Sequence, residues 1–224
     1  MIIYSENILI CIEIPLLISL LFIDRASRRF VVSFITGMVV CLLSAYITAF
    51  LSRVSGLDSQ SASIYYSPVV EEMMKMMPLL FYMFVFNPKD RRLFICGTGL
   101  GLGFATFENC CYMLSSGSDN FTYILIRGMA VGVLHLVCAL ALVIILTDAR
   151  KHHVLSVSGV FGALSLSVTL HGLYNLLVSE PGISSYIGYI LPAAASAALY
   201  IPGRRRIMAD SNENKNAAAQ TKNS

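Results

Sequence analysis

The sequence predicts an all-α, polytopic membrane protein, a helix bundle of about seven transmembrane helices with its N-terminus outside and its C-terminus in the cytoplasm. Hydrophobic residues make up 56% of the 224 residues and charged residues only 13%. A soluble domain carries about a quarter charged residues. The mean hydropathy of +0.71 reflects uninterrupted apolar runs. Such runs have the length of a spanning helix, about 17 to 25 residues. These observations exclude a soluble globular fold.

Each predicted span is an apolar run bounded by charged or turn residues. The first run is the shortest, and Glu13 and Pro15 interrupt it. Residues 1–202 form one transmembrane domain, and the polar, aperiodic segment 203–224 predicts a disordered cytoplasmic tail. The seven runs are 7–23, 30–51, 67–86, 93–114, 121–146, 154–178 and 186–202.

The basic residues of the short loops predict the orientation, because cytoplasmic loops carry an excess of lysine and arginine. The loops after the first, third, fifth and seventh runs hold eleven of them, whereas the opposite loops hold only Arg53. The eleven are Arg25, Arg28, Arg29, Lys89, Arg91, Arg92, Arg150, Lys151, Arg204, Arg205 and Arg206.

Several ionisable side chains lie inside the predicted spans. Each charged side chain costs on the order of 2.5–3.5 kcal/mol of insertion free energy at the centre of a spanning helix. The summed cost would be too high for the protein to fold in a membrane if these side chains were unpaired. On four helices they fall at one depth, roughly 6 to 12 Å below the outer surface at 1.5 Å per residue. The sequence therefore predicts one polar site in the outer leaflet. The ionisable residues inside the spans are Glu13, Glu71, Glu72, Lys75, Glu108, Arg127, His135 and His171, of which Glu13 is left outside the predicted site.

Helical spacing gives each polar residue a partner or a direction. Glu71 and Lys75 are four residues apart with the acid first, which predicts an ion pair between them. Glu72 points about 100° away. His171 and Asn175 are also four residues apart, so their donors share one helix face.

At these residues the chain resembles the PrsW family of intramembrane proteases and, more distantly, the CAAX prenyl endopeptidase and bacteriocin-immunity superfamily. The resemblance covers roughly residues 65–180 and implies a bacterial plasma-membrane endopeptidase. Its substrate would be a single-pass membrane protein such as an anti-sigma factor, cut at site 1 in envelope-stress signalling, with no nucleic-acid partner. The motifs are EExxK (Glu71, Glu72, Lys75), FxxxEN (Phe104, Glu108, Asn109), His135 after Arg127, and HxxxN (His171, Asn175).

The roles expected from these motifs divide into a catalytic and a supporting set. Glu71 and Glu72 would polarise a water molecule, His171 and Asn175 would stabilise an oxyanion, and His135 with Glu108 would hold the water. Lys75, Asn109 and Arg127 would support them. A divalent metal such as zinc could bind among the carboxylates and histidines, or no metal is required; the sequence leaves both mechanisms open. The candidate ligands are Glu71, Glu72, Glu108, His135 and His171.

Three other interpretations fit parts of the pattern. A buried polar network could serve helix packing alone, a proton-coupled transporter or channel also needs charged residues in its spans, and an immunity or scaffold protein would bind a partner without chemistry. Transporters usually contain repeated halves, which this sequence lacks. The glycine-rich segment 97–103 lies within a span, so it predicts close helix packing rather than a nucleotide-binding loop.

Overall fold

The computed structural model describes residues 5–116, 121–152 and 157–201. Every regular element in these ranges is helical, which confirms the all-α class. The predicted tail 203–224 lies outside the described residues. The helices are α1 (Ser5–Ser19), α2 (Arg25–Ser55), α3 (Ser59–Tyr65), α4 (Ser67–Phe86), α5 (Asp90–Ser116), α6 (Phe121–Lys151), α7 (Val157–Val178) and a final helix, Ile183–Ile201.

Four helices are long and apolar enough to cross a membrane: Ser27–Ser55, Ile124–Lys151, Ser158–Val178 and Ile183–Ile201. The protein is therefore a multi-pass membrane protein by length and composition. The other predicted spans are helical too, but α1 has only 15 residues and α4 carries three charged residues. The count of seven spans stays a prediction.

The short helix α3 was not predicted, because its residues lie in the loop expected between the second and third spans. Asp58 caps its N-terminus by accepting a hydrogen bond from the Ser61 backbone N–H at 2.7 Å. This bond holds the pKa of Asp58 below its usual value. Helix α4 follows directly, with proline in its first turn, where a missing N–H costs nothing, and ends at Asn87 in the left-handed conformation.

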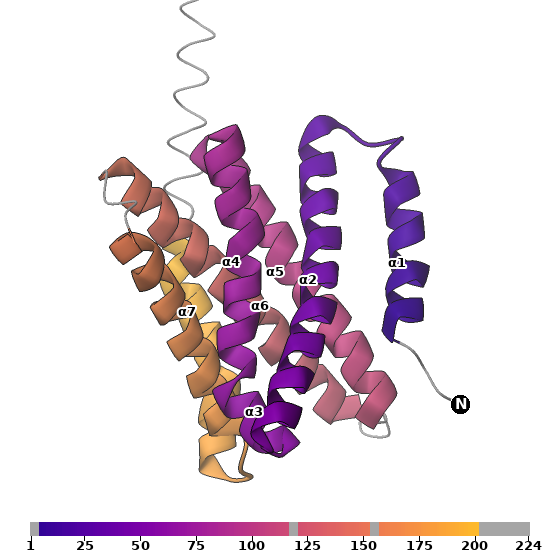
Figure 1. Ribbon diagram of the computed structural model, residues 1–224, viewed down its shortest axis with the longest axis vertical. Helices are drawn as coiled ribbons and strands as arrows, with labels where there is room; N and C mark the ends of the chain where they lie inside the picture. The colour runs from indigo at the N-terminus through magenta and orange to yellow at the C-terminus, as the bar shows by residue number, and fades with distance from the viewer. Residues whose placement is uncertain (1–4, 117–120, 153–156, 202–224) are drawn as a thin grey trace, which may run out of the picture.

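Helix α5 lies between α2 and α6, and its glycines set the distances to both neighbours (Figure 1). A Cβ atom on Gly103 would collide with the Phe34 backbone of α2. One on Gly101 would lie 2.8 Å from the carbonyl oxygen of His135 on α6. The predicted role of the glycine segment in close packing is confirmed. Helix α1 stands at the edge of the bundle beside α2 (Figure 1).

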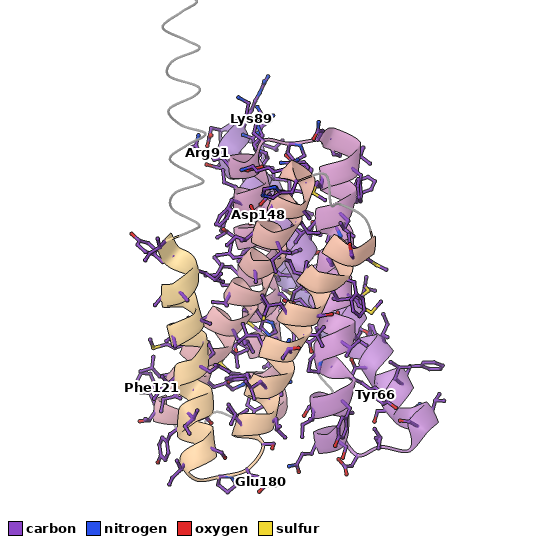
Figure 2. All side chains as sticks on the ribbon, turned by 90° about the vertical axis from the view of Figure 1, so that its left-hand side faces the viewer. Tyr66, Lys89, Arg91, Phe121, Asp148 and Glu180 are labelled. Atoms are coloured by element: carbon purple, nitrogen blue, oxygen red, sulfur yellow. The ribbon has the colours of Figure 1, made fainter. Side chains whose placement is uncertain are left out.

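The two ends of the bundle differ in charge. Figure 2 shows Lys89, Arg91 and Asp148 at one end, and Tyr66, Phe121 and Glu180 at the other. At the first end Asp90 accepts bonds from Arg150 at 2.6 Å and Lys151 at 2.5 Å, which ties the start of α5 to the end of α6. We call this end, where Lys89, Arg91, Arg150 and Lys151 lie, the basic end.

We expect Gly103→Ala to lower the stability of the folded protein by about 1–3 kcal/mol, because the new methyl group meets backbone atoms that cannot rotate away. Thermal unfolding in detergent measures this. Gly162→Ala on α7 is the matched control, since nothing lies within 4 Å of its added Cβ. Equal unfolding midpoints for the two variants would show that the close packing of α2 against α5 at Gly103 does not limit the stability of the protein.

Candidate functional site

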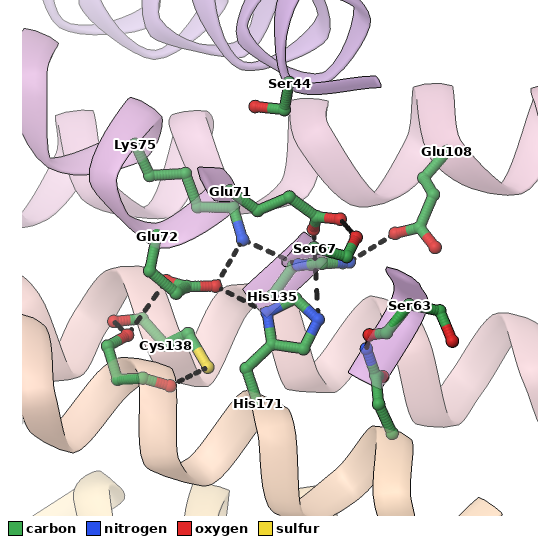
Figure 3. A network of polar contacts seen from close by, with 12 residues as sticks. Ser44, Ser63, Ser67, Glu71, Glu72, Lys75, Glu108, His135, Cys138 and His171 are labelled. Carbon is green, nitrogen blue, oxygen red and sulfur yellow. Dashed lines mark hydrogen bonds and ion pairs between the residues drawn. The ribbon is translucent and has the colours of Figure 1, made fainter. Parts of the chain in front are cut away.

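Helix α4 supplies the centre of the polar site. Glu72 and Lys75 are one turn apart and fully buried, whereas the Glu71 side chain is 13% exposed and faces the opening of the site. Helix α5 contributes Glu108, α6 contributes His135, and α7 contributes His171. The prediction that charged residues of separate helices meet is confirmed by the bonds in Figure 3.

Glu72 is the most highly bonded residue of the site. Its Oε1 accepts from Lys75 Nζ at 2.7 Å and from His171 Nδ1 at 2.8 Å, and its Oε2 accepts from Ser167 Oγ at 2.9 Å. The charge of a buried carboxylate needs this many donors. Because Glu72 is fully buried and three protein donors take up its carboxylate oxygens, it is placed to hold α7 and Lys75 rather than to touch a substrate.

The ion pair of Lys75 corrects one expectation. The spacing predicted a pair with Glu71, but Lys75 bonds Glu72, three residues away, and the Nδ1 atom of His135 at 2.7 Å. Glu71 turns instead toward Ser67, which donates to its Oε1. Lys75 pairs with Glu72 because α6 and α7 bring His135 and His171 to the side of α4 on which Glu72 lies.

The hydrogen bonds assign different tautomers to the two histidines. Lysine has only donors, so His135 Nδ1 accepts from Lys75, and the Nε2–H of His135 donates to Glu108. His171 donates from Nδ1 to Glu72, which leaves its Nε2 as an acceptor. The rings meet edge to face with centroids 5.1 Å apart. His171 thus offers a lone pair to the site, and His135 offers a hydrogen.

Glu71 is the carboxylate that the site does not satisfy. Its Oε2 is buried and has no hydrogen-bond partner among the described residues, and it lies 3.8 Å from His171 Nε2. The site holds three carboxylates and two fixed cations, since Glu108 pairs with Arg127 at 3.4 Å and Glu72 pairs with Lys75. Glu71 is therefore the carboxylate of this site that pairs with neither fixed cation, and its ion-pair contact is with His171.

Arg127 closes one side of the site. Its guanidinium group stacks on the Tyr112 ring at 3.5 Å while one of its nitrogens bonds Glu108. Such stacking with a partly desolvated cation is favourable by about 1 kcal/mol. The Nε atom of Arg127 is buried without a partner among the described residues. Glu108 is 32% exposed, so this side of the site is open to the surface of the bundle.

The two asparagines lie differently. Asn175 donates one amide hydrogen to the Ser63 carbonyl oxygen of α3 at 2.8 Å, which ties α3 to α7. Its second amide hydrogen remains available, because an amide nitrogen has two. The Oδ1 atom of Asn109 is buried and has no hydrogen-bond partner among the described residues. Glu13 lies outside the predicted site, and its buried Oε1 atom likewise has no hydrogen-bond partner among the described residues.

A cleft of about 350 Å³ opens onto these groups. Its polar wall is formed by Glu71, Glu108, His135 and His171, and its rim includes Gln60, Ser63, Arg127, Asn175 and Ser179. Glu72 and Lys75 lie behind the wall. The cleft also has an apolar lining, formed by Val131, Leu134, Tyr174, Val178 and Tyr189.

Sequence reasoning missed the serines that hold the carboxylates. Ser67 bonds Glu71, and Ser167 bonds Glu72. Each lies four residues before a site residue, Ser67 before Glu71 and Ser167 before His171. That spacing on one helix face was the available signal, but serine is common in membrane helices, so it carries little weight alone.

Three of these residues could hold a metal ion. Glu71, His135 and His171 offer ligand atoms within 4.8 Å of one another. The unpartnered Glu71 Oε2 and the acceptor Nε2 of His171 fit a divalent cation, and Glu72 holds the other nitrogen of His171 as carboxylates hold metal-bound histidines. His135 fits less directly, because its Nε2 hydrogen bonds Glu108.

Comparison with known proteins identifies the family. A sequence model described as the PrsW family intramembrane metalloprotease matches residues 26–200, which is most of the chain. No curated protein and no solved structure matched the chain. The matched range contains every residue of the cleft wall. The chain therefore belongs to the PrsW family of intramembrane metalloproteases, and it is a membrane-embedded peptidase.

Proposed function

We propose that the cleft is the active site, and that it hydrolyses a peptide bond of a membrane-tethered protein. The observation that carries this proposal is the buried Glu71 Oε2 atom, which has no hydrogen-bond partner among the described residues and lies 3.8 Å from the Nε2 atom of His171. A carboxylate and an imidazole acceptor that face one space can bind a water molecule and take its proton. Solvent reaches the cleft past Glu108.

Glu71 acts as the general base in this proposal, and Glu72 acts as a positioning residue. Sequence reasoning gave both carboxylates a share in activating water. The bonds of Glu72 to Lys75, His171 and Ser167 support the narrower role, because all its strong acceptor directions point at protein donors. Through Nδ1 of His171, Glu72 keeps the Nε2 lone pair directed into the cleft.

A divalent metal such as zinc would be held by Glu71 and His171, with His135 as a third ligand once its Nε2 is released from Glu108. When bound, such an ion lowers the pKa of a coordinated water to about 7 and polarises the substrate carbonyl. The chain's own residues orient the substrate and stabilise the charge that develops. Without a metal, Glu71 and His171 are left to activate the water by themselves.

The oxyanion that forms on the peptide carbonyl needs donors already in place. We assign this role to Asn175, through its second amide hydrogen, and to His171 after Glu71 has passed to its Nε2 the proton taken from water. Both residues line the cleft on one face of α7. The apolar lining of the cleft supports binding of an apolar substrate side chain next to the cleaved bond.

The substrate and the location are proposed from the family resemblance. We propose a single-pass anti-sigma factor as the substrate, site-1 cleavage in a stress response as the process, and the bacterial plasma membrane as the location. The proposed orientation, with seven spans and the basic end in the cytoplasm, sets the cleft in the outer leaflet. Glu71 lies four residues from the start of α4, about 6 Å along the helix, at the end away from the basic residues.

We expect a reporter fused after residue 206 to be cytoplasmic, and one inserted near residue 118 to be external. The physical reason is the excess of lysine and arginine at the basic end. Alkaline phosphatase and a fluorescent protein, fused at each position in turn, report the two sides in opposite ways. The reverse pattern at either position would move the cleft to the inner leaflet.

We expect Glu71→Gln to reduce cleavage of a tethered substrate by several orders of magnitude at an unchanged melting temperature. The amide keeps the shape of the side chain but cannot take a proton. Glu72→Gln is the comparison, and it should lower the melting temperature as well, because the buried Lys75 charge loses its partner at a cost of about 3–5 kcal/mol. Single-turnover cleavage in liposomes and thermal unfolding measure the two effects.

Elemental analysis of the same proteins tests the metal. A metal-dependent site predicts bound metal in the wild type, its loss in Glu71→Gln, and recovery of wild-type cleavage when zinc is added back after chelation. Chelator-resistant cleavage by metal-free wild-type protein would show that the carboxylate acts alone. Near-normal cleavage by Glu71→Gln would contradict Glu71 both as the base of the metal-free mechanism and as a ligand in the metal-dependent one.

We expect Asn175→Ala to slow single-turnover cleavage by about 10² to 10³, the usual loss for one oxyanion donor, with substrate binding nearly unchanged. The variant also removes the bond to Ser63 O. Gln60→Ala is therefore the control, because it removes a bond from α3 to the residue that follows α7, Gln60 Nε2 to Ser179 O at 3.3 Å. Similar losses in both variants would mean that Asn175 only fastens α3.

A further inference from the structure

A second cavity lies near the basic end of the bundle, away from the catalytic cleft. It has a volume of about 420 Å³ and runs between α2, α4 and α5. Its floor is apolar, with Leu79, Leu100 and Pro78 among its residues, and Phe81 and Phe86 form its exposed edge. We call it the α2/α4/α5 groove. It shares no lining residue with the catalytic cleft.

Two arginines stand at one end of this groove. Arg28 and Arg29 belong to the first turns of α2, and no carboxylate is among the described residues that line the groove. The Nε atom of Arg29 is buried and lacks a hydrogen-bond partner among the described residues, whereas Arg28 Nε donates to the Ile23 carbonyl oxygen at 3.0 Å. A buried guanidinium nitrogen without an acceptor is costly, so a ligand with oxygen acceptors would stabilise this arrangement.

The groove combines a cationic end with an apolar length. From Arg29 to Thr36, which also lines it, the groove extends about 10 Å along α2 at 1.5 Å per residue. Its edge residues Phe81 and Phe86 are exposed on the outer surface of the bundle, where the lipid chains of a membrane would lie. A soluble anion would match the arginines alone and leave the apolar floor uncovered.

We propose that the α2/α4/α5 groove binds one anionic phospholipid. Its phosphate group accepts hydrogen bonds from Arg28 and Arg29, and one acyl chain lies along Val32, Leu79 and Phe81. Arginine suits a phosphate because its planar guanidinium donates two parallel hydrogen bonds. Clusters of basic residues next to a spanning helix attract anionic lipids by the same electrostatics. The occupant comes from the leaflet next to the basic end.

Fluorescence quenching can test this site because the chain contains no tryptophan. Phe86→Trp places a single indole at the groove, since Phe86 is 63% exposed and lines it. Phe161→Trp on α7 is the control, at a position that is 68% exposed near the same end but outside the groove. Each protein is reconstituted in mixtures that contain brominated phosphatidylglycerol or brominated phosphatidylcholine, and quenching gives the relative binding constant of each lipid.

We expect the anionic lipid to be preferred by about tenfold at Phe86→Trp and to show little preference at Phe161→Trp. Adding Arg28→Gln and Arg29→Gln should remove the preference. The double variant Lys89→Gln with Arg91→Gln removes the same amount of charge at the same end but outside the groove. It should retain most of the preference for the anionic lipid. Equal quenching by both lipids at Phe86→Trp, or equal loss of preference in both charge variants, would overturn the proposal.

Two further arms keep the result interpretable. If the arginine variants do not fold, the comparison of Phe86→Trp with Phe161→Trp in proteins that retain both arginines still decides the question. Added inorganic phosphate should not displace the brominated phosphatidylglycerol, because the acyl chain contributes to binding. Displacement by phosphate alone would show an anion site rather than a phospholipid site and would contradict the proposal.

Discussion

The buried carboxylate of Glu72 is the contact on which the rest of the site depends. It is the meeting point of α4 and α7, and through Lys75 it also reaches α6. A charge in this position has no access to water, so each of its donors must be in place for the helices to pack. The same bonds that make Glu72 tolerable in the bundle set the nitrogen that each histidine presents to the cleft. Stability and chemistry therefore depend on one residue.

Much of this arrangement could be predicted from the sequence, because burial of charge in a membrane is so restrictive. Glu71, Glu108, His135 and His171 were expected in one layer, and they line one cleft. The glycines of 97–103 were expected to allow close packing, and Gly101 and Gly103 do so. In both cases only one arrangement of the helices satisfies the local pattern at a low free-energy cost, so the three-dimensional arrangement follows from the sequence pattern.

The remaining features depend on contacts between distant segments. Spacing alone could not decide whether Lys75 pairs with Glu71 or Glu72, because both lie within reach on one helix. The approach of α6 and α7 decides it. Helix α3 is too short to be stable by itself, and it is held by Asp58 and by bonds to α7. The serines at Ser67 and Ser167 gain importance only from the carboxylates opposite them.

The back of the site is buried and its mouth is exposed. This difference affects how water, the second reactant of hydrolysis, can reach the site. Hydrolysis consumes water, which a bilayer interior excludes. At the back of the site Glu72 and Lys75 are sealed from solvent, whereas Glu108 at the mouth is 32% exposed and keeps Arg127 beside it. Charged groups at the entrance make a hydrated channel there less costly than a dry one. In the proposed mechanism, this charged and exposed mouth is the side from which water can enter the cleft, because the back of the site is sealed.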